Sequence, residues 1–368
     1  MLMLVFAIIS SVVIYGCAQQ RTETKQDTST DVTKQGKARV SLLDTEIMER
    51  NGQKYIVDPS KIEAVLPRDA IPAILEPKFV KAGEADFISD EEYVLGVFVG
   101  NEAKAYPIKI LNYHEIVNDA IGGTNVIVTY CPLCGTGLSF IRDLDRKTYT
   151  FGVSGKLYNS DLVMYDHQTE TYWTQALGLG IVGPLTKKRL TPIITDTIKW
   201  KEWKAKHPDT LVLSTDTGFI RNYERDPYEG YDRSSRIWFP IEVQDDRLFS
   251  KARVYGIMVN GESKAYPEDI IKKKKVINDF VGNKNILVVV RDDGTVRFFS
   301  KDELPIKDQQ VMFSIKNGKL TDTTGSEWDF DGNALSGELK GNKMPIIVAD
   351  YLFWFAWANF HPDTGLYS

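Results

Sequence analysis

The chain has 368 residues, of which 43% are hydrophobic and 26% are charged, the composition of an ordinary globular protein with a real core. Its net charge is -5, and its longest basic run is the short segment Lys272–Lys275. Without a basic field there is nothing to attract nucleic acid, so we expect no nucleic-acid partner. The length predicts two or three domains.

Residues 1–15 form an apolar run that is short for a transmembrane helix and typical of a secretory signal. The run ends at Gly16-Cys17, and a small residue before a cysteine resembles the lipobox of prokaryotic lipoproteins, in which the cysteine is lipidated. Tyr15 is bulky for that motif and no basic residue precedes the run, so an uncleaved anchor is the alternative. Both readings of the segment 1–17 predict an extracytoplasmic protein held at a membrane, in the periplasm or at the cell surface.

Residues 18–40 are polar and show no hydrophobic period, which predicts a disordered tether. A random coil of this length spans about 25 Å. If Cys17 carries lipid, only Cys131 and Cys134 remain, which is too few for a scaffold held together by disulfides.

A repeat organises the rest of the chain. Residues 96–134 align without a gap with residues 256–294, at an offset of 160 and with 13 identities in 39 positions. Further along, the spacing Trp200-x-x-Trp203-x-x-x-His207 recurs as Trp354-x-x-Trp357-x-x-x-His361. The repeat predicts a first half at 41–215, a connector at 216–250 and a second half at 251–368.

The local pattern is the same in both copies. Short β-branched runs predict strands, a proline predicts the first turn of a short helix, and Asn-Asp is expected to end that helix. These features lie at 94–99 and 254–259, at Pro107 and Pro267, at 118–119 and 278–279, and at 126–130 and 286–290. We therefore predict a mainly β, α+β fold of two pseudo-symmetric halves, each with a small sheet and short helices.

The two copies also act as controls for each other. Residues that both copies keep are expected to serve the fold, and His207 and His361 are expected to cap their helices or to form local hydrogen bonds. Residues that only the first half has are candidates for function, and they are Tyr113-His114-Glu115, Cys131–Gly135 and Tyr158–Tyr165. This comparison predicts that the second half lacks a site.

The sharpest motif is Cys131-Pro-Leu-Cys134-Gly, which directly follows a predicted strand. Gly135 and Gly137 argue against a helix there, whereas a thioredoxin-type pair needs a helix N-terminus to lower the pKa of its first thiol. The motif resembles the metal-binding knuckle of rubredoxins and zinc ribbons. A disulfide between the two cysteines is the alternative in an oxidising compartment.

One knuckle supplies two ligands, and a tetrahedral site needs two more. His114 is the first choice for the third ligand, because its helix directly precedes the strand that leads to Cys131. The candidates for the fourth are Glu115, Asp161, Met164 and His167. Zinc and copper both remain open, and a methionine ligand would favour copper.

Four segments resemble the domain of unknown function 3179 family: Arg68–Val80, Ala105–Asp119, Tyr130–Gly135 and Phe151–Trp173. The resemblance runs from about residue 60 to the C-terminus, and one departure is His167, which stands where that family has arginine. It supports the architecture and the importance of the cysteine motif, and it implies no reaction.

The leading hypothesis is an extracytoplasmic, lipid-anchored protein that binds zinc or copper through Cys131, Cys134 and His114. The second is a redox protein or enzyme that uses the cysteines as a dithiol. The third is a non-catalytic binding module. The sequence contains no phosphate-binding loop or nucleotide fingerprint, and it identifies no catalytic residue, substrate or protein partner.

Overall fold

The computed structural model describes residues 41–306 and 311–368, so the predicted signal segment 1–17, with Cys17, and the tether 18–40 lie outside it. Strands dominate, which confirms the prediction of a mainly β, α+β protein. The described residues contain four α-helices of seven residues each: α1 (Ile108–His114), α2 (Trp200–Lys206), α3 (Glu268–Lys274) and α4 (Trp354–Phe360). None of the described helices has the length and apolarity to cross a membrane.

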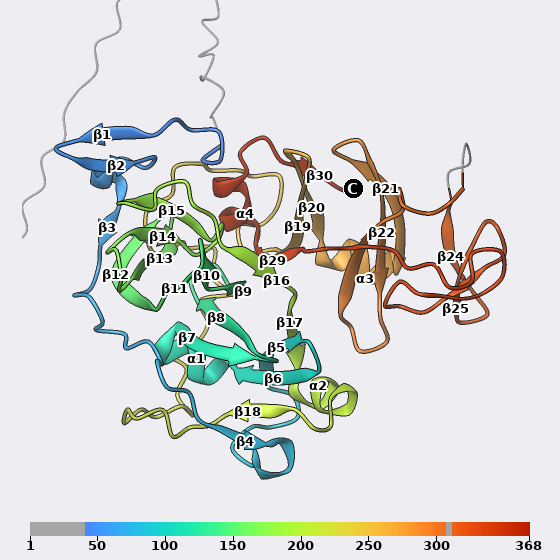
Figure 1. The fold of residues 1–368 in the computed structure, drawn as a ribbon, viewed down its shortest axis with the longest axis horizontal. Coiled ribbons are helices and arrows are strands. Elements are labelled where there is room, and N and C mark those ends of the chain that lie inside the picture. The colour runs from blue at the N-terminus through green and yellow to red at the C-terminus, as the bar shows by residue number, and fades with distance from the viewer. Residues whose placement is uncertain (1–40, 307–310) are drawn as a thin grey trace, which may run out of the picture. The chain divides into compact units, whose positions relative to one another are not determined.

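The first half contains three larger sheets and one small hairpin (Figure 1). One sheet has the order β17 (Thr195–Lys199), β5 (Tyr93–Val99), β6 (Glu102–Pro107), β18 (Leu211–Leu213), β4 (Phe79–Lys81). A second has the order β16 (Thr191–Ile193), β9 (Thr136–Ile141), β8 (Thr124–Cys131), β7 (Ile116–Ile121). The third has the order β1 (Met48–Arg50), β2 (Gln53–Tyr55), β15 (Leu179–Val182), β14 (Tyr172–Thr174), β13 (Asp161–Asp166), β12 (Phe151–Tyr158), β3 (Glu63–Ala64), and the hairpin is β10 (Asp143–Leu144) with β11 (Lys147–Thr148).

The second half contains three four-stranded sheets. The first has the order β29 (Asp350–Phe353), β19 (Arg253–Val259), β20 (Glu262–Pro267), β30 (Gly365–Leu366). The second has the order β21 (Val276–Val281), β22 (Lys284–Val290), β23 (Val296–Ser300), β28 (Ile346–Ile347). The third has the order β24 (Phe313–Lys316), β25 (Lys319–Asp322), β26 (Glu327–Trp328), β27 (Ala334–Ser336).

Equivalent strands of the two halves pair in the same order and register. The order β17-β5-β6-β18 corresponds to β29-β19-β20-β30, and β7-β8-β9-β16 corresponds to β21-β22-β23-β28. Val94 pairs with Pro107 in the first half, and Val254 pairs with Pro267 in the second. The strands predicted at 94–99, 126–130, 254–259 and 286–290 are all present, although each half has several sheets where one was expected.

The predicted ends of the short helices are wrong. α1 ends at His114 and α3 ends at Lys274, whereas Asn118-Asp119 and Asn278-Asp279 lie inside strands β7 and β21. The next residues, Glu115 and Lys275, have φ of 56° and 60°, and this left-handed conformation turns the chain out of the helix. The β-branched residues that follow then start a strand.

The two tryptophan helices pack in the same way in both halves. A Cβ at Gly96 would lie 2.3 Å from the ring of Trp203, and a Cβ at Gly256 would lie 2.3 Å from the ring of Trp357. His207 and His361 are the C-caps of α2 and α4, which confirms their predicted role. The repeated motif therefore builds the same helix-on-sheet contact twice.

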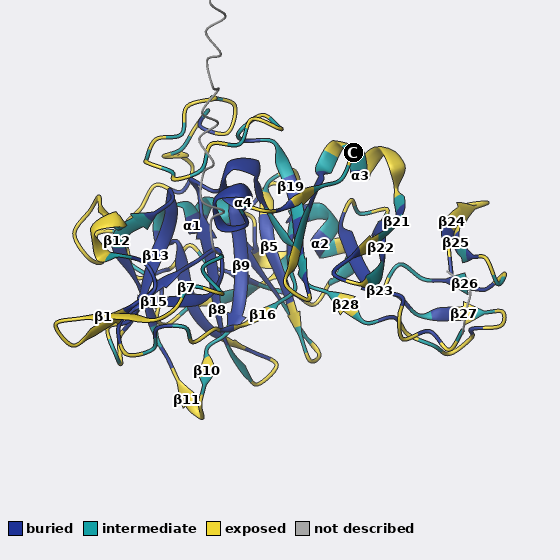
Figure 2. Ribbon diagram, turned by 90° about the horizontal axis from the view of Figure 1, so that it is seen from above, coloured by how far each residue is buried: buried dark blue, intermediate teal, exposed yellow. Residues whose placement is uncertain are grey.

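The segment between the halves, residues 214–252, contains neither helix nor strand. One of its residues, Tyr231, belongs to a hydrophobic cluster that also contains Cys131 and Cys134 of the first half and Phe353 of the second. The backbone N–H of Phe353 donates a hydrogen bond to the Cys134 carbonyl oxygen at 2.9 Å. Figure 2 shows that β8, β9 and β13 are buried, so the cysteine motif lies in the interior.

Candidate metal centre

The cysteine turn joins two central strands of the first half. β8 ends at Cys131 and β9 begins at Thr136, which confirms the predicted turn after a strand. Gly135 has φ 60°, and a Cβ there would lie 2.5 Å from the guanidinium of Arg253 and 2.8 Å from the ring of Phe353. The position therefore requires glycine both for its backbone conformation and for the close approach of the second half.

Both sulfurs are buried, since Cys131 is 2% exposed and Cys134 is 0% exposed, and neither forms a disulfide. Burial raises the pKa of both thiols, and raises that of Cys134 well above its usual range. A protonated thiol is a weak nucleophile, because the thiolate is the reactive form. A bound metal ion would displace the proton and stabilise the thiolate.

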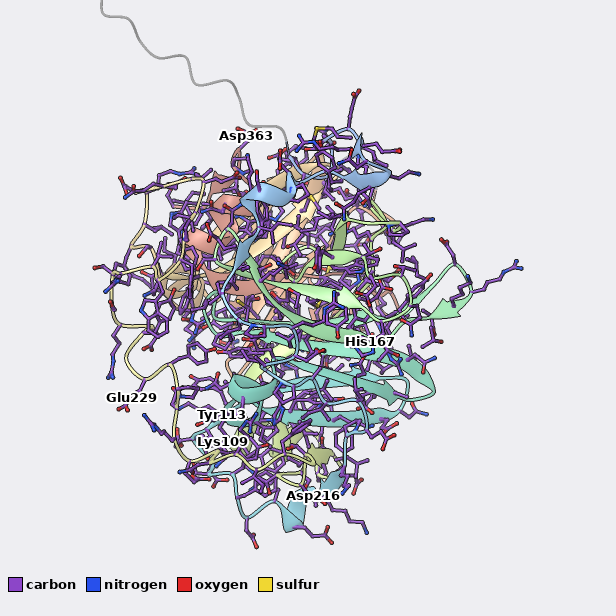
Figure 3. All side chains as sticks on the ribbon, turned by 90° about the vertical axis from the view of Figure 1, so that its left-hand side faces the viewer. Lys109, Tyr113, His167, Asp216, Glu229 and Asp363 are labelled. Atoms are coloured by element: carbon purple, nitrogen blue, oxygen red, sulfur yellow. The ribbon has the colours of Figure 1, made fainter. Side chains whose placement is uncertain are left out.

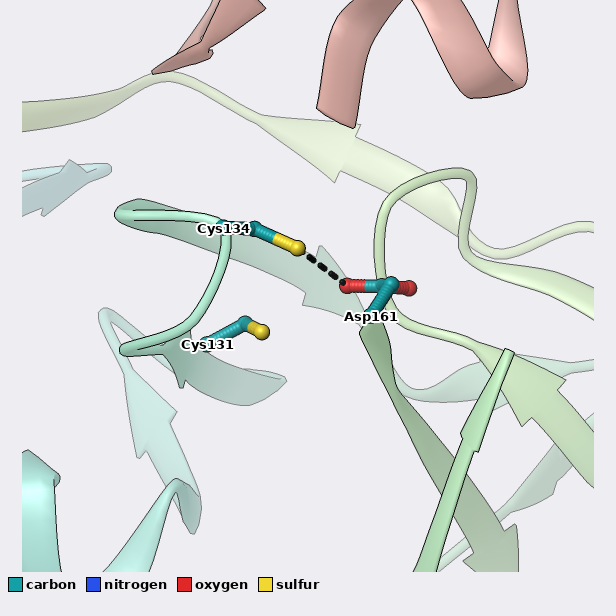
Figure 4. Close-up of side chains that lie close together, drawn as sticks. All are labelled: Cys131, Cys134 and Asp161. Atoms are coloured by element: carbon teal, nitrogen blue, oxygen red, sulfur yellow. Dashed lines mark hydrogen bonds between the residues drawn. The ribbon is translucent and has the colours of Figure 1, made fainter. Parts of the chain in front are cut away.

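A β-hairpin brings Asp161 to the two sulfurs. Its strands β12 and β13 are joined by Asn159 and Ser160, whose φ angles of 52° and 62° suit a two-residue hairpin turn. Cys134 Sγ lies 3.6 Å from Asp161 Oδ1 and 3.4 Å from the Ser160 carbonyl oxygen (Figure 4). Cys131 Sγ lies 4.0 Å from the same carbonyl oxygen. The potential ligand atoms of Cys131, Cys134 and Asp161 all lie within 4.8 Å of one another.

The carboxyl group of Asp161 is held in one orientation. Its Oδ2 accepts hydrogen bonds from Thr174 Oγ1 at 3.1 Å and from the backbone N–H of Ala176 at 3.0 Å. Its Oδ1 is then left to face the sulfurs. Outer hydrogen bonds of this kind orient the first ligands of a metal site.

Glu115 adds a second buried carboxyl group beside this cluster. Burial, reinforced by the charge of Asp161, raises the pKa of Glu115 to about 8. Burial also raises the pKa of Asp161 to about 7. No cationic side chain is among the main causes of the raised pKa values of these two carboxyl groups and the two thiols. The interior therefore holds four acidic groups that a divalent cation would stabilise in their ionised forms.

Unsatisfied polar atoms surround the same place. The hydroxyl groups of Ser160 and Tyr231 and the side-chain amide nitrogen of Asn159 are buried, and among the described residues none of the three has a hydrogen-bond partner. Nearly all buried polar groups in native proteins have such a partner. Ser160 and Asn159 form the tip of the hairpin that carries Asp161, so these unpaired polar atoms lie next to the candidate ligands.

The structure places His114 away from the cysteines. Its Nδ1 lies 2.8 Å from the Pro72 carbonyl oxygen, and its Nε2 lies 2.7 Å from the Tyr223 hydroxyl. Both ring nitrogens are thus occupied, and His114 does not join the group formed by Cys131, Cys134 and Asp161. The predicted helix position was close to the cysteines in sequence, but the left-handed residue Glu115 turns the chain between them.

Two further candidates are not grouped with Asp161. Met164 is three positions along β13 from Asp161, so its side chain leaves the strand on the other face, and it belongs to the hydrophobic cluster that also contains Cys131 and Cys134. His167 is exposed at the surface, where its ring lies 5.1 Å from that of Tyr165 (Figure 3). His167 is thus exposed, whereas the two sulfurs are buried, and Met164 does not share the strand face of Asp161.

A cavity of about 400 Å³ adjoins the cysteine turn. Its wall includes Pro132 and Gly135 of the turn, Tyr231 of the connecting segment and Arg253 of the second half. The Arg253 guanidinium donates a hydrogen bond to the Gly135 carbonyl oxygen. The cavity thus adjoins the turn that carries the two cysteines, whose side chains are themselves buried.

Residues 68–364 match the family described as protein of unknown function, DUF3179. The chain belongs to this family. No curated protein and no solved structure matches it. The family description names no activity, so the function of this DUF3179 protein has to be argued from its own site.

Sequence reasoning found part of this DUF3179 site. Cys131, Cys134 and Asp161 were all candidates, because each lies in a segment that the second half lacks. It missed the Ser160 carbonyl oxygen and the Tyr231 hydroxyl. A left-handed hairpin turn gives Ser160 its place, and Tyr231 lies in a segment without regular structure, so neither has a periodic signal.

Proposed function

We propose that this DUF3179 protein binds one transition metal ion, zinc in the first place, through Cys131, Cys134 and Asp161. The observation that carries the proposal is the group of three buried donor side chains whose ligand atoms lie within 4.8 Å of one another. Glu115 stands beside them as a second carboxyl group. The hydrogen bonds to Asp161 Oδ2 hold the carboxylate ready for this role.

The distances suit a tetrahedral ion. With Zn–S near 2.3 Å and Zn–O near 2.0–2.2 Å, a sulfur and an oxygen ligand of one zinc ion lie about 3.5–3.7 Å apart. Cys134 Sγ and Asp161 Oδ1 are 3.6 Å apart. The pair needs no rearrangement to share an ion.

The ligand types favour zinc over copper. Zinc accepts both thiolate sulfur and carboxylate oxygen ligands, whereas Cu(I) prefers soft ligands such as thiolates and thioethers. Met164, the only thioether among the candidates, faces away from Asp161. Zinc is therefore the ion to test first.

The test is the metal content of the purified full chain and of its variants. We expect about one zinc per chain, and loss of most of it in Cys131→Ser and in Cys134→Ser, because each removes one thiolate ligand. Met164→Leu is the control, since this swap conserves volume and should leave the metal content unchanged. A wild type that is folded and free of metal would refute the proposal.

A dithiol function is the second candidate, and one observation favours it. Asp161 Oδ1 lies 3.6 Å from Cys134 Sγ, where it could accept the thiol proton in a thiol–disulfide exchange, in which the disulfide of a partner protein is reduced to two thiols and Cys131 and Cys134 are oxidised to a disulfide. Thiol titration before and after reduction distinguishes the two functions. A quantitative Cys131–Cys134 disulfide in metal-free protein would favour the dithiol function.

We also propose that the protein is extracytoplasmic and lipid-anchored through Cys17, on the basis of the apolar run that ends at Gly16-Cys17. Cys17→Ser should release the protein from the membrane fraction or leave an uncleaved precursor. Unchanged membrane retention, with no lipid adduct on the wild type, would contradict this proposal.

We further propose that the two halves arose by internal duplication. The gapless alignment of 96–134 with 256–294 and the common strand order support this origin. At the positions of Glu115 and Cys131 the second half has Lys275 and Arg291, so a neighbouring carboxyl group and one ligand of the metal centre are replaced by basic residues.

A further inference from the structure

A second cavity, of about 420 Å³, lies where the two halves meet. The first half contributes Arg189 and the second half contributes Asp350 and His361. The cavity shares no residue with the candidate metal centre. Its volume falls within the range of about 300–1,000 Å³ that is typical of sites for small molecules.

The equivalent of Asp350 in the first half is Asp196, and its carboxylate has a cationic partner. Asp350 pairs with Gly256 in the β29–β19 ladder, just as Asp196 pairs with Gly96 in the β17–β5 ladder. Asp196 accepts two hydrogen bonds of 2.6 Å from the guanidinium of Arg297. This buried pair neutralises the Asp196 carboxylate.

The partner of Asp350 is missing. The residue in the first half that corresponds to Arg297 is Leu138. Arg297 pairs with Val289 in the β22–β23 ladder, and Leu138 pairs with the equivalent residue, Thr129, in the β8–β9 ladder. Asp350 is half-buried, and its carboxyl group forms no hydrogen bond or ion pair with any described residue. The carboxylate opens instead onto the cavity.

Arg189 supplies the opposite charge. The Arg189 guanidinium is exposed and forms no ion pair with any described residue, yet it is close enough to affect the pKa of both Asp350 and His361. The His361 ring is stacked at 3.8 Å on Trp357, and burial lowers its pKa to about 3, so it is neutral. A cation-binding group and an anion-binding group thus face the same space.

We propose that this cavity binds a zwitterion of the amino-acid class with an apolar side chain. Its ammonium group would occupy the place that the Arg297 guanidinium takes beside Asp196, and its carboxylate would pair with Arg189. Phe140, Leu177 and Met258 line the remaining wall and suit an apolar side chain. The terminal residue of a peptide carries only one of these two charges. A free amino acid carries both, so it is the ligand that we propose.

The experiment is calorimetric titration of the full chain with three matched probes. L-Leucine carries both charges, isopentylamine lacks the carboxylate, and 4-methylpentanoate lacks the ammonium group. We expect leucine to bind at least tenfold more tightly than either analogue. Equal binding of the three probes, or no binding of leucine, would overturn the proposal.

Two variants test the residues. Arg189→Ala should weaken leucine binding at least tenfold, whereas Lys188→Ala, a neighbouring surface lysine paired with Asp145, should leave it unchanged. Asp350→Asn should also weaken binding. If Asp350→Asn does not fold, Arg189→Ala decides, because its side chain is exposed, and unchanged affinity in Arg189→Ala would refute the site.

Discussion

Asp161 and Asp166 are buried carboxylates at the two ends of strand β13, and only Asp161 faces the sulfurs. Asp161→Asn should remove most of the bound zinc, because the amide is a much poorer ligand than the carboxylate. Metal analysis by mass spectrometry, with thermal melting alongside, is the measurement.

Asp166→Asn is the matched control for this change. The Asp166 carboxylate accepts hydrogen bonds from Thr169 and from Trp173 Nε1, and the latter is 3.0 Å long. Its replacement should lower stability by about 1–3 kcal/mol and leave the zinc content unchanged. Loss of zinc in both variants to the same degree would mean that metal loss follows unfolding, and Asp161 would no longer count as a ligand.

The pH dependence of the free energy of unfolding gives a second test at the scale of residues. Burial raises the pKa of Asp161 from 3.8 to about 7 and that of Glu115 from 4.5 to about 8. The folded state therefore keeps these protons at pH values where the unfolded chain has lost them. The metal-free protein should be stabilised most below about pH 4 by these groups, and it should lose this stability as the pH rises through about 7–8.

The zinc-bound protein should behave in the opposite way. Zinc displaces the proton of Asp161 and of both thiols, so its affinity should increase with pH over the same window. Melting temperatures measured with chelator and with zinc would show the two trends. Parallel curves would indicate that the carboxyl groups do not titrate in the metal site.

Sequence reasoning reached the cysteine pair and Asp161 because both are absent from the second half. It could not place His114, whose ring nitrogens are occupied by the Pro72 carbonyl oxygen and the Tyr223 hydroxyl. Both partners are distant in the sequence, at separations of 42 and 109 residues. Contacts between residues so far apart in the sequence cannot be predicted from a local sequence pattern.

At the scale of elements, the helices α2 and α4 give a paired prediction. Trp203 and Trp357 are each 1% exposed and lie directly over Gly96 and Gly256. Trp203→Ala and Trp357→Ala should each destabilise the fold by about 3–5 kcal/mol, because each leaves a large cavity. Denaturant unfolding measures both. A small loss in only one variant would show that the two helices are not equivalent supports.

The ends of α1 and α3 are boundaries that could not be predicted from the sequence. Asn118 and Asn278 look like helix-ending residues, but each lies within a strand, where its amide bonds the backbone of Phe151 or Phe313. The helices end just before Glu115 and Lys275, two charged residues with positive φ. Charged residues are poor predictors of a left-handed turn, since glycine and asparagine usually fill that role.

At the scale of the whole molecule, the described part of the second half has no metal centre of its own but packs against the metal centre of the first half. Arg253 and Phe353 pack on Gly135, and Tyr231, Val254 and Trp354 share a hydrophobic cluster with the cysteines. The two halves should therefore unfold together in a single cooperative transition. Calorimetry is the measurement, and two separate transitions would show that the halves are independent domains.

The most direct test of the metal centre is X-ray absorption at the zinc edge of the purified full chain. Two sulfur neighbours near 2.3 Å and oxygen or nitrogen neighbours near 2.0–2.2 Å are the expected first shell. A shell of oxygen and nitrogen alone would mean that zinc binds elsewhere. Folded protein with no zinc and a quantitative Cys131–Cys134 disulfide would contradict the account and leave the dithiol function in its place.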